Sequence, residues 1–241
     1  MKLHRFIGEY DLSKQEVKII NPETIKQIRA VLRLEIGKKI ILSDGKGNEK
    51  EVVIISMSKN EILCEVEKTD LSRVTLDKNK HVNLYLAILK KENFELAVQK
   101  ATECGVLKII PIITERTIKT GINIERLEKI IIEASEQSGR NIVPTLSPIL
   151  KFKDALNDAK NSEEKVIFHF VENNYAPNKK ATEASIFVGP EGGFTEKEIK
   201  LAKDADFAVS SLGPLTLRGE TAAIVATYLT VYNADVGRQD S

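Results

Sequence analysis

Two glycine- and proline-rich stretches near the end of the chain carry the residue types best suited to holding a ligand. The first reads Gly-Pro-Glu-Gly-Gly-Phe over residues 189–194, and the second reads Leu-Gly-Pro-Leu-Thr-Leu-Arg-Gly-Glu-Thr-Ala over residues 212–222. Glycine lets backbone groups approach a ligand closely, and proline stiffens a turn. Each stretch follows a short apolar segment typical of a buried strand, so we expect both at the carboxyl edge of a sheet, where α/β proteins bind ligands.

Neither stretch has the spacing of a standard nucleotide-binding loop. The first is not a GxGxxG turn, and neither contains the GxxxxGK[ST] pattern of a P-loop. A dinucleotide-binding enzyme would also need an acidic residue about 20 positions beyond its glycine turn. A dehydrogenase or a related nucleotide-binding enzyme is therefore the less favoured alternative.

The elements that must position these stretches alternate between strand and helix from residue 82 onward. This alternation predicts an α/β domain with a mostly parallel sheet. Strands are expected at residues 82–88, 108–113, 166–170, 185–188 and 207–212, and helices at 92–104, 123–138, from the Thr195 capping box, and at 219–232.

Residues 1–70 predict a second, smaller domain. Short strands at 39–43, 51–55 and 62–66 are divided by turns, and Asn21-Pro22 opens a helix that should end before Gly37. This pattern favours a small β-barrel or curled sheet with one inserted helix. Because residues 68–80 form a polar linker, we expect two domains, 1–70 and 71–241.

The charge of the chain is balanced overall but uneven along its length. The 36 Lys and Arg against 35 Asp and Glu give a net charge of +1, which divides into +1, +5 and −5 over residues 1–70, 71–153 and 154–241. The balance argues against a protein that coats nucleic acid by bulk charge, whereas the basic middle favours local contacts.

Cysteine, histidine and hydropathy patterns set further limits. Cys64 and Cys104 stand apart and the three histidines are scattered, so no metal site is predicted. No apolar run approaches the ~20 residues that a membrane helix needs, and the first residues lack a signal-peptide pattern. We therefore expect a reduced, cytoplasmic protein with no membrane partner.

The two stretches at 189–194 and 212–222 resemble the signature of SPOUT-class methyltransferases, in the form used by the RsmE family. Further segments in the same order resemble motifs of that family, so the likeness covers almost the whole chain. These segments are Arg5-Phe6, Val31-Leu32-Arg33, Asp44-Gly45, Lys100–Val106, Ile110-Pro111, Thr114-Glu115-Arg116 and Ile132–Arg140.

The resemblance implies a fold and an activity. It implies a small PUA-like β-barrel followed by a SPOUT α/β domain with a C-terminal trefoil knot, assembled as a homodimer through the knotted domain. The implied reaction is methylation of N3 of a specific uridine in 16S ribosomal RNA by S-adenosylmethionine, on the RNA or on the 30S subunit. The alternative is a non-catalytic RNA-binding or ribosome-assembly protein that kept the fold.

The resemblance also implies roles for individual residues. Arg218 would orient the nucleotide or stabilise enolate charge. Glu220 or Glu191 would help to remove the N3 proton or hold the positive end of the cofactor, although a carboxylate at Glu220 also suits a helix N-terminus. The cofactor would contact Phe168, Val188, Gly189, Pro190, Glu191, Gly192, Leu212, Gly213, Leu217 and Thr221. RNA would contact Arg5, Arg29, Arg33, Arg116 and Arg140.

Four residues depart from the family pattern. Lys26-Gln27 stand where the family commonly has His-His, Cys104 replaces a leucine, and Leu215 replaces an arginine. These differences concern single RNA contacts rather than the class of reaction.

Overall fold

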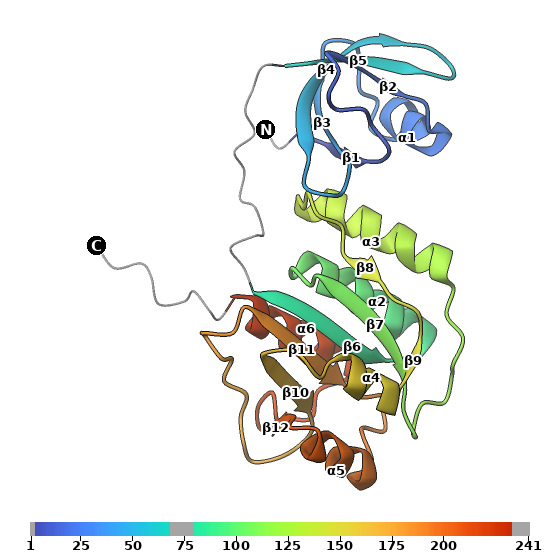
Figure 1. Cartoon of the computed structure of the whole chain (residues 1–241). Helices are drawn as coiled ribbons and strands as arrows, with labels where there is room; N and C mark the ends of the chain where they lie inside the picture. The colour runs from blue at the N-terminus through green and yellow to red at the C-terminus, as the bar shows by residue number, and fades with distance from the viewer. Residues whose placement is uncertain (1–2, 68–79, 233–241) are drawn as a thin grey trace. The chain divides into compact units, whose positions relative to one another are not determined.

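The computed structural model describes residues 3–67 and 80–232, which form two compact units (Figure 1). The first unit contains residues 3–67 together with 135–143, and the second contains 80–134 and 144–232. Residues 68–79, which hold the predicted domain boundary and nearly all of the predicted linker, lie outside the described residues.

A five-stranded sheet forms the first unit. Its order is β1-β3-β4-β5-β2, with β1 parallel to β3 and the other neighbours antiparallel. The strands are β1 (Arg5–Ile7), β2 (Glu16–Ile19), β3 (Lys39–Ser43), β4 (Glu49–Met57) and β5 (Ile62–Val66). Alternating residues such as Ile40, Leu42, Val52 and Ile54 fill its core, as expected of a sheet with one buried face. The predicted curled sheet is confirmed.

The inserted helix of the first unit is short and irregular. Asn21 caps α1 (Pro22–Lys26), because its side-chain oxygen accepts hydrogen bonds from the backbone N–H groups of Glu23 at 2.9 Å and Thr24 at 3.1 Å. The chain then continues as a π-helical turn, η1 (Gln27–Val31), and Arg33 follows with a φ of 50°. Helix geometry therefore ends a few residues earlier than the sequence predicted.

Seven strands form the sheet of the second unit, and every pairing is parallel. The order is β12-β10-β11-β6-β7-β8, and β9 also pairs with β7. The strands are β6 (His81–Ala87), β7 (Lys108–Ile113), β8 (Thr145–Leu146), β9 (Leu150–Lys151), β10 (Glu164–Phe168), β11 (Glu183–Val188) and β12 (Ala208–Ser210). The predicted parallel α/β sheet is confirmed.

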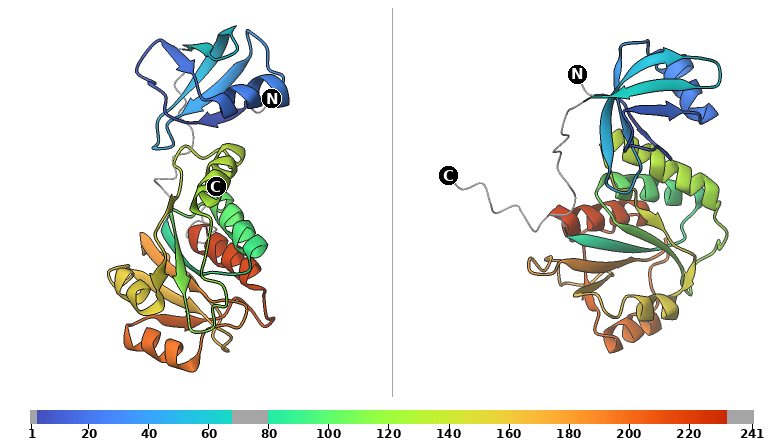
Figure 2. Two further views of the ribbon diagram at one scale, coloured as in Figure 1. Left: turned by 90° about the vertical axis from the view of Figure 1, so that its right-hand side faces the viewer. Right: turned by 45° about the horizontal axis from the view of Figure 1, so that its top comes forward.

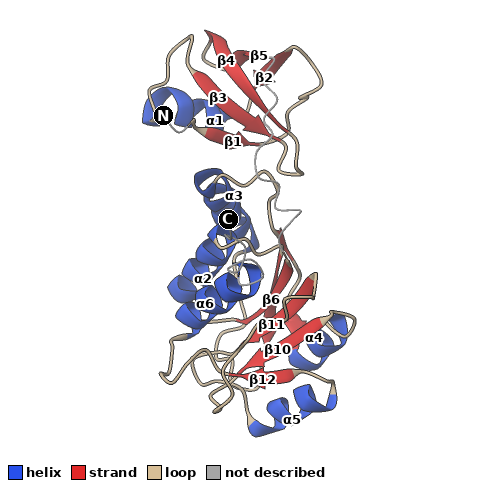
Figure 3. Ribbon diagram, turned by 90° about the vertical axis from the view of Figure 1, so that its left-hand side faces the viewer, coloured by secondary structure: helices blue, strands red, loops and turns tan. Residues whose placement is uncertain are grey.

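Helices cover both faces of this sheet. On one face lie α2 (Lys91–Glu103) and α6 (Gly219–Tyr232), and on the other lie α4 (Phe152–Asp158) and α5 (Glu196–Asp204), as Figures 2 and 3 show. A further helix, α3 (Ile124–Ser138), ends in residues that belong to the first unit. Burial on both faces explains why the strands read as continuous apolar runs.

The described residues contain no candidate for a membrane span. Across residues 3–67 and 80–232, no helix is both long enough and apolar enough to cross a bilayer.

Candidate active site

A cavity of about 670 Å³ opens in the second unit at the carboxyl ends of β6, β10, β11 and β12. Its walls come from the segments that follow these strands, including both of the glycine-rich stretches. The volume lies within the roughly 300–1,000 Å³ of small-molecule sites. The position is the one that parallel sheets use for ligands.

The first glycine-rich stretch is held in place on both sides. A hydrogen bond of 2.8 Å from the Gly193 N–H to the Pro190 carbonyl closes its turn. One carboxylate oxygen of Glu191 accepts from the Lys90 N–H at 3.1 Å, and Arg116 donates to the Gly192 carbonyl at 2.6 Å. Because these partners come from the segments that follow β6 and β7, other loops at the same edge of the sheet fix the shape of this one.

The second stretch depends on glycine at two positions. Gly213 has a φ of 131°, which side chains other than glycine rarely adopt. At Gly219 the first turn of α6 packs so closely that an added Cβ would lie 2.8 Å from a methyl group of Leu89. The stretch can therefore curve along the cavity and lead directly into α6.

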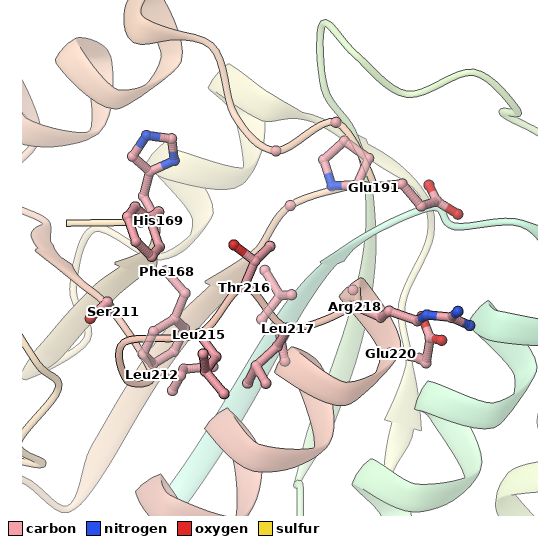
Figure 4. Close-up of a pocket in the computed structure, with 18 of the residues that line it drawn as sticks. Phe168, His169, Glu191, Ser211, Leu212, Leu215, Thr216, Leu217, Arg218 and Glu220 are labelled. Atoms are coloured by element: carbon pink, nitrogen blue, oxygen red, sulfur yellow. The ribbon is translucent and has the colours of Figure 1, made fainter.

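Arg218 and Glu220 lie together on one side of the cavity, with Phe168, His169 and Ser211 on the other (Figure 4). Arg218 is exposed. Glu220 is 7% exposed, and its Oε2 atom has no hydrogen-bond partner among the described residues. Buried polar atoms nearly always have a partner, so this oxygen is available to a bound molecule.

The cavity brings together most of the residues predicted to bind the cofactor. Nine of the ten line it, and Thr221 does not. The nine are Phe168, Val188, Gly189, Pro190, Glu191, Gly192, Leu212, Gly213 and Leu217. Both predicted catalytic residues, Arg218 and Glu220, line it as well.

Several lining residues were not predicted. Lys90 and Asn93 come from the segment after β6, and His169 and Phe170 come from the segment after β10. Their strands pair with β11, so the sheet order would have identified these segments. The remaining unpredicted lining residues are Gly193, Ser211, Leu215, Thr216, Gly219 and Ala222.

The arginines predicted to contact RNA fall into two groups. Arg29, Arg33 and Arg116 are exposed. Arg5 and Arg140 are buried in the first unit at 7% and 6% exposure, where Arg5 pairs with Glu49 at 2.8 Å and Arg140 donates to the Ile142 carbonyl at 3.0 Å. Burial of these two guanidinium groups favours a role inside the first unit.

Comparison with known proteins identifies the family. Residues 76–231 match the RNA methyltransferase domain family, and residues 20–67 match the RNA methyltransferase PUA domain family. The ribosomal RNA small subunit methyltransferase E of Rickettsia conorii is 33% identical over 235 residues, which cover 94% of each chain. The chain belongs to the ribosomal RNA small subunit methyltransferase E family. The RsmE family named by the sequence motifs is therefore confirmed.

Two solved structures of methyltransferases agree with this membership. A ribosomal RNA small subunit methyltransferase E from Neisseria gonorrhoeae, bound to S-adenosyl methionine, is 30% identical, with a TM-score of 0.83 and coverage of 94% of this chain and 95% of that one. A Legionella pneumophila protein in complex with the bound cofactor SAM is 31% identical, with a TM-score of 0.80. The predicted combination of a PUA-like domain and a SPOUT α/β domain is confirmed.

Proposed function

We propose that this protein transfers the methyl group of S-adenosylmethionine to N3 of one uridine in 16S ribosomal RNA. Membership in the RsmE family confirms the predicted enzyme class, an RNA methyltransferase acting on the small subunit. We propose in addition that the target is one uridine and that the methylated atom is N3. Because its substrate is ribosomal RNA, we infer that the protein acts in the cytoplasm.

The proposal rests on the cavity and on the Glu220 carboxylate in its wall, whose Oε2 atom has no hydrogen-bond partner among the described residues. The two glycine-rich stretches provide closely spaced backbone groups, and Phe168, Val188, Leu212 and Leu217 provide apolar walls. Such a lining suits a cofactor that combines a flat nucleoside with a charged tail. The buried Glu220 oxygen adds a negative group that suits the positive end of S-adenosylmethionine or a proton on the substrate.

S-adenosylmethionine supplies an activated methyl group on its sulfonium, so the protein's task is to position the uridine and to assist loss of the N3 proton. The target base must be unpaired or flipped, since N3 lies inside a Watson–Crick pair. We assign Arg218 to the uridine carbonyl oxygens. Its guanidinium is exposed at the cavity and permanently charged, which suits stabilisation of the negative charge that develops on O2 and O4.

Glu220 is the preferred group to accept the N3 proton. Its Oε2 atom is buried without a hydrogen-bond partner, whereas one oxygen of Glu191 already accepts from the Lys90 N–H. Because a group that is free of other partners can approach the proton directly, Glu220 fits the role better than Glu191.

The first unit offers a basic groove for RNA. A groove of about 520 Å³ has three cationic lining residues, Lys26, Arg29 and Lys59, and no carboxylate among its lining residues. Lys26 occupies a position where the family commonly has histidine, so the departure places an ammonium group there. We assign Arg29, Arg33 and Arg116 to phosphate contacts, which fix the position of the RNA without reading its sequence.

Two further features of the family are part of the proposal, the trefoil knot and the homodimer. The chain leaves the edge strand β12, passes beside Asn174, and returns to pack α6 against β6 and β11, which is a path that a knot requires. Two large hydrophobic side chains are exposed here, Tyr228 on α6 and Leu215 in the segment before it. Their exposure supports an interface with a partner protomer at this part of the second unit.

Transfer of labelled methyl groups tests the proposal. The protein is incubated with labelled S-adenosylmethionine and unmethylated small-subunit RNA, either naked or in 30S particles, and with large-subunit RNA as the control. We expect label in small-subunit RNA alone. Binding of small-subunit RNA without any transfer would favour a non-catalytic protein instead.

A further inference from the structure

Tyr175 joins the wall of the cavity to a buried ion pair. It lies between β10 and β11, and its N–H donates to the Ser211 carbonyl at 2.8 Å. Its ring stands perpendicular to that of Phe168, with the centroids 5.0 Å apart. Ser211 and Phe168 both line the cavity. One residue thus touches two parts of the cavity wall without lining the cavity itself.

The hydroxyl of Tyr175 points to charged groups inside the unit. It donates to Glu164 at 3.0 Å and lies 3.0 Å from the hydroxyl oxygen of Thr230 in α6. Burial raises the pKa of this hydroxyl, and the neighbouring Glu164 carboxylate raises it further, so the group remains a proton donor at neutral pH.

Glu164, which accepts this hydrogen bond, forms an ion pair with Lys80, and both residues have further hydrogen-bond partners. Lys80 donates to Glu164 at 2.7 Å and to the Asn178 carbonyl at 2.6 Å. The Asn178 N–H donates to the same Glu164 oxygen as Tyr175, at 3.0 Å. The Lys80 and Glu164 side chains are 1% and 7% exposed, so the pair lies in a region of low dielectric where such bonds are strong.

The segment that leads from β10 to β11 is therefore attached at both ends of its central part. Asn173 accepts from the Ser211 N–H at 2.8 Å, and the Ser211 hydroxyl donates to Asn174 at 3.0 Å. These bonds place the segment beside the start of the second glycine-rich stretch. The ion pair holds the other side of the same segment, and Tyr175 lies between the two.

We propose that Tyr175 is a positioning residue for the cofactor cavity, which transmits the fixed position of the Lys80–Glu164 pair to Phe168 and Ser211. This inference rests on the proposed function, because it assigns S-adenosylmethionine to that cavity. Without the hydroxyl, the Tyr175 ring and Ser211 lose their link to the ion pair, while the ion pair keeps its Asn178 contacts. The cavity wall then samples more positions, and the cofactor must order it on binding.

Tyr85 provides a matched control in the same unit. Its hydroxyl also donates to a carboxylate, Asp158, at 2.7 Å, and its ring stacks on Phe187 with centroids 4.3 Å apart. Burial raises its pKa as it does that of Tyr175. Tyr85 does not line the cavity, and its hydroxyl and ring meet Asp158 and Phe187 instead of Ser211 and Phe168.

The experiment compares Tyr175→Phe with Tyr85→Phe in the full chain. Both variants lose one tyrosine hydroxyl bonded to a carboxylate, so both should lose some thermal stability. We expect Tyr175→Phe alone to weaken calorimetric binding of S-adenosylmethionine, by about tenfold, and to raise KM for it with little change in kcat. In the ligand-free protein, the amide hydrogens of Tyr175 and Ser211 should exchange faster in Tyr175→Phe than in Tyr85→Phe.

Equal cofactor affinity and equal amide exchange in the two variants would overturn the inference, since Tyr175 would then contribute stability alone. Failure of the unaltered protein to bind S-adenosylmethionine would instead count against the proposed function. In that case amide exchange in the ligand-free variants still decides whether Tyr175 positions the wall.

Discussion

Two buried carboxylates in the second unit have equal exposure and opposite surroundings. Glu164 and Glu220 are each 7% exposed. Glu164 accepts hydrogen bonds from the Lys80 ammonium, the Tyr175 hydroxyl and the Asn178 N–H, whereas Glu220 keeps one oxygen without a partner. A carboxylate whose partners come from the fold supports the fold, and one left open is available to a ligand.

Helix α6 contacts the surroundings of both carboxylates. Its first turn carries Gly219 and Glu220 into the cavity, and Thr230 near its other end meets the Tyr175 hydroxyl. The Thr230 hydroxyl donates to the Ala226 carbonyl at 2.7 Å, which keeps that end of α6 regular. The open site is thus built on an element whose far end is fixed by satisfied polar groups, as a preorganised site requires.

The largest expected effect separates the two carboxylates by stability. Glu164→Gln leaves the Lys80 ammonium buried without its carboxylate, and we expect a loss of about 3–5 kcal/mol in the free energy of unfolding. Glu220→Gln should change it by less than about 1 kcal/mol, because no bond to its Oε2 atom is lost. Urea denaturation measures both. Glu61→Gln, which removes the exposed ion pair with Lys18, is the control and should cost less than about 1 kcal/mol.

The next largest effect concerns Arg218, which lines the cavity together with Glu220. Arg218→Ala should reduce kcat by about 10²–10³-fold, because the charge on the uridine oxygens loses its stabilising cation. Cofactor affinity, measured by calorimetry, should change little. Arg126→Ala removes another exposed arginine of the second unit, paired with Glu95 at 2.7 Å, and should leave kcat unchanged. Unaltered turnover in Arg218→Ala would remove this residue from the catalytic assignment.

A smaller effect distinguishes the two acidic residues of the cavity. Glu220→Gln keeps the shape of the side chain but cannot accept a proton, so kcat should fall about 10²-fold. Glu191→Gln should have a weaker effect, since that side chain already binds the Lys90 N–H. Single-turnover methylation measures both variants. A larger loss with Glu191→Gln would transfer the role of proton acceptor to that residue.

The smallest effect extends the comparison to the arginines of the first unit. Arg29→Ala and Arg33→Ala should each weaken RNA binding about fivefold and reduce the slope of log affinity against log salt by about one. Lys14→Ala, which alters an exposed lysine paired with Asp11, is the control. A salt slope that stays the same in both arginine variants would place the phosphate contacts elsewhere.

Much of the fold follows from patterns that are local in the sequence. The strands β5 and β7 and the helix α6 have the predicted bounds, because continuous apolar runs and terminal glycines mark them directly. The Thr195 capping box forms as expected, with the Glu198 side chain accepting from the Thr195 N–H at 2.9 Å. Local signals of this kind need no knowledge of distant partners.

Features that depend on distant partners could not be predicted. Lys80 and Glu164 lie 84 positions apart in the sequence and meet only because β10 and β6 both pair with β11. Lys90 and Asn93 reach the cavity for the same reason. Arg5 was predicted to contact RNA, yet Glu49 at the start of β4 pairs with it in the interior of the first unit. The short strands β1 and β2 were missed because three or four residues show too little alternation.

Mapping the methylated base tests the central claim most directly. Unmethylated 30S particles are treated with the protein and S-adenosylmethionine, and the RNA is then analysed by reverse transcription and nucleoside mass spectrometry. A methyl group on N3 blocks Watson–Crick pairing, so the account predicts a new reverse-transcription stop at one uridine of 16S RNA, together with N3-methyluridine in the digest. At matched, short reaction times Arg218→Ala should weaken both signals about 10²–10³-fold. Methylation of another atom or base, or no methylation of 16S RNA at all, would contradict it.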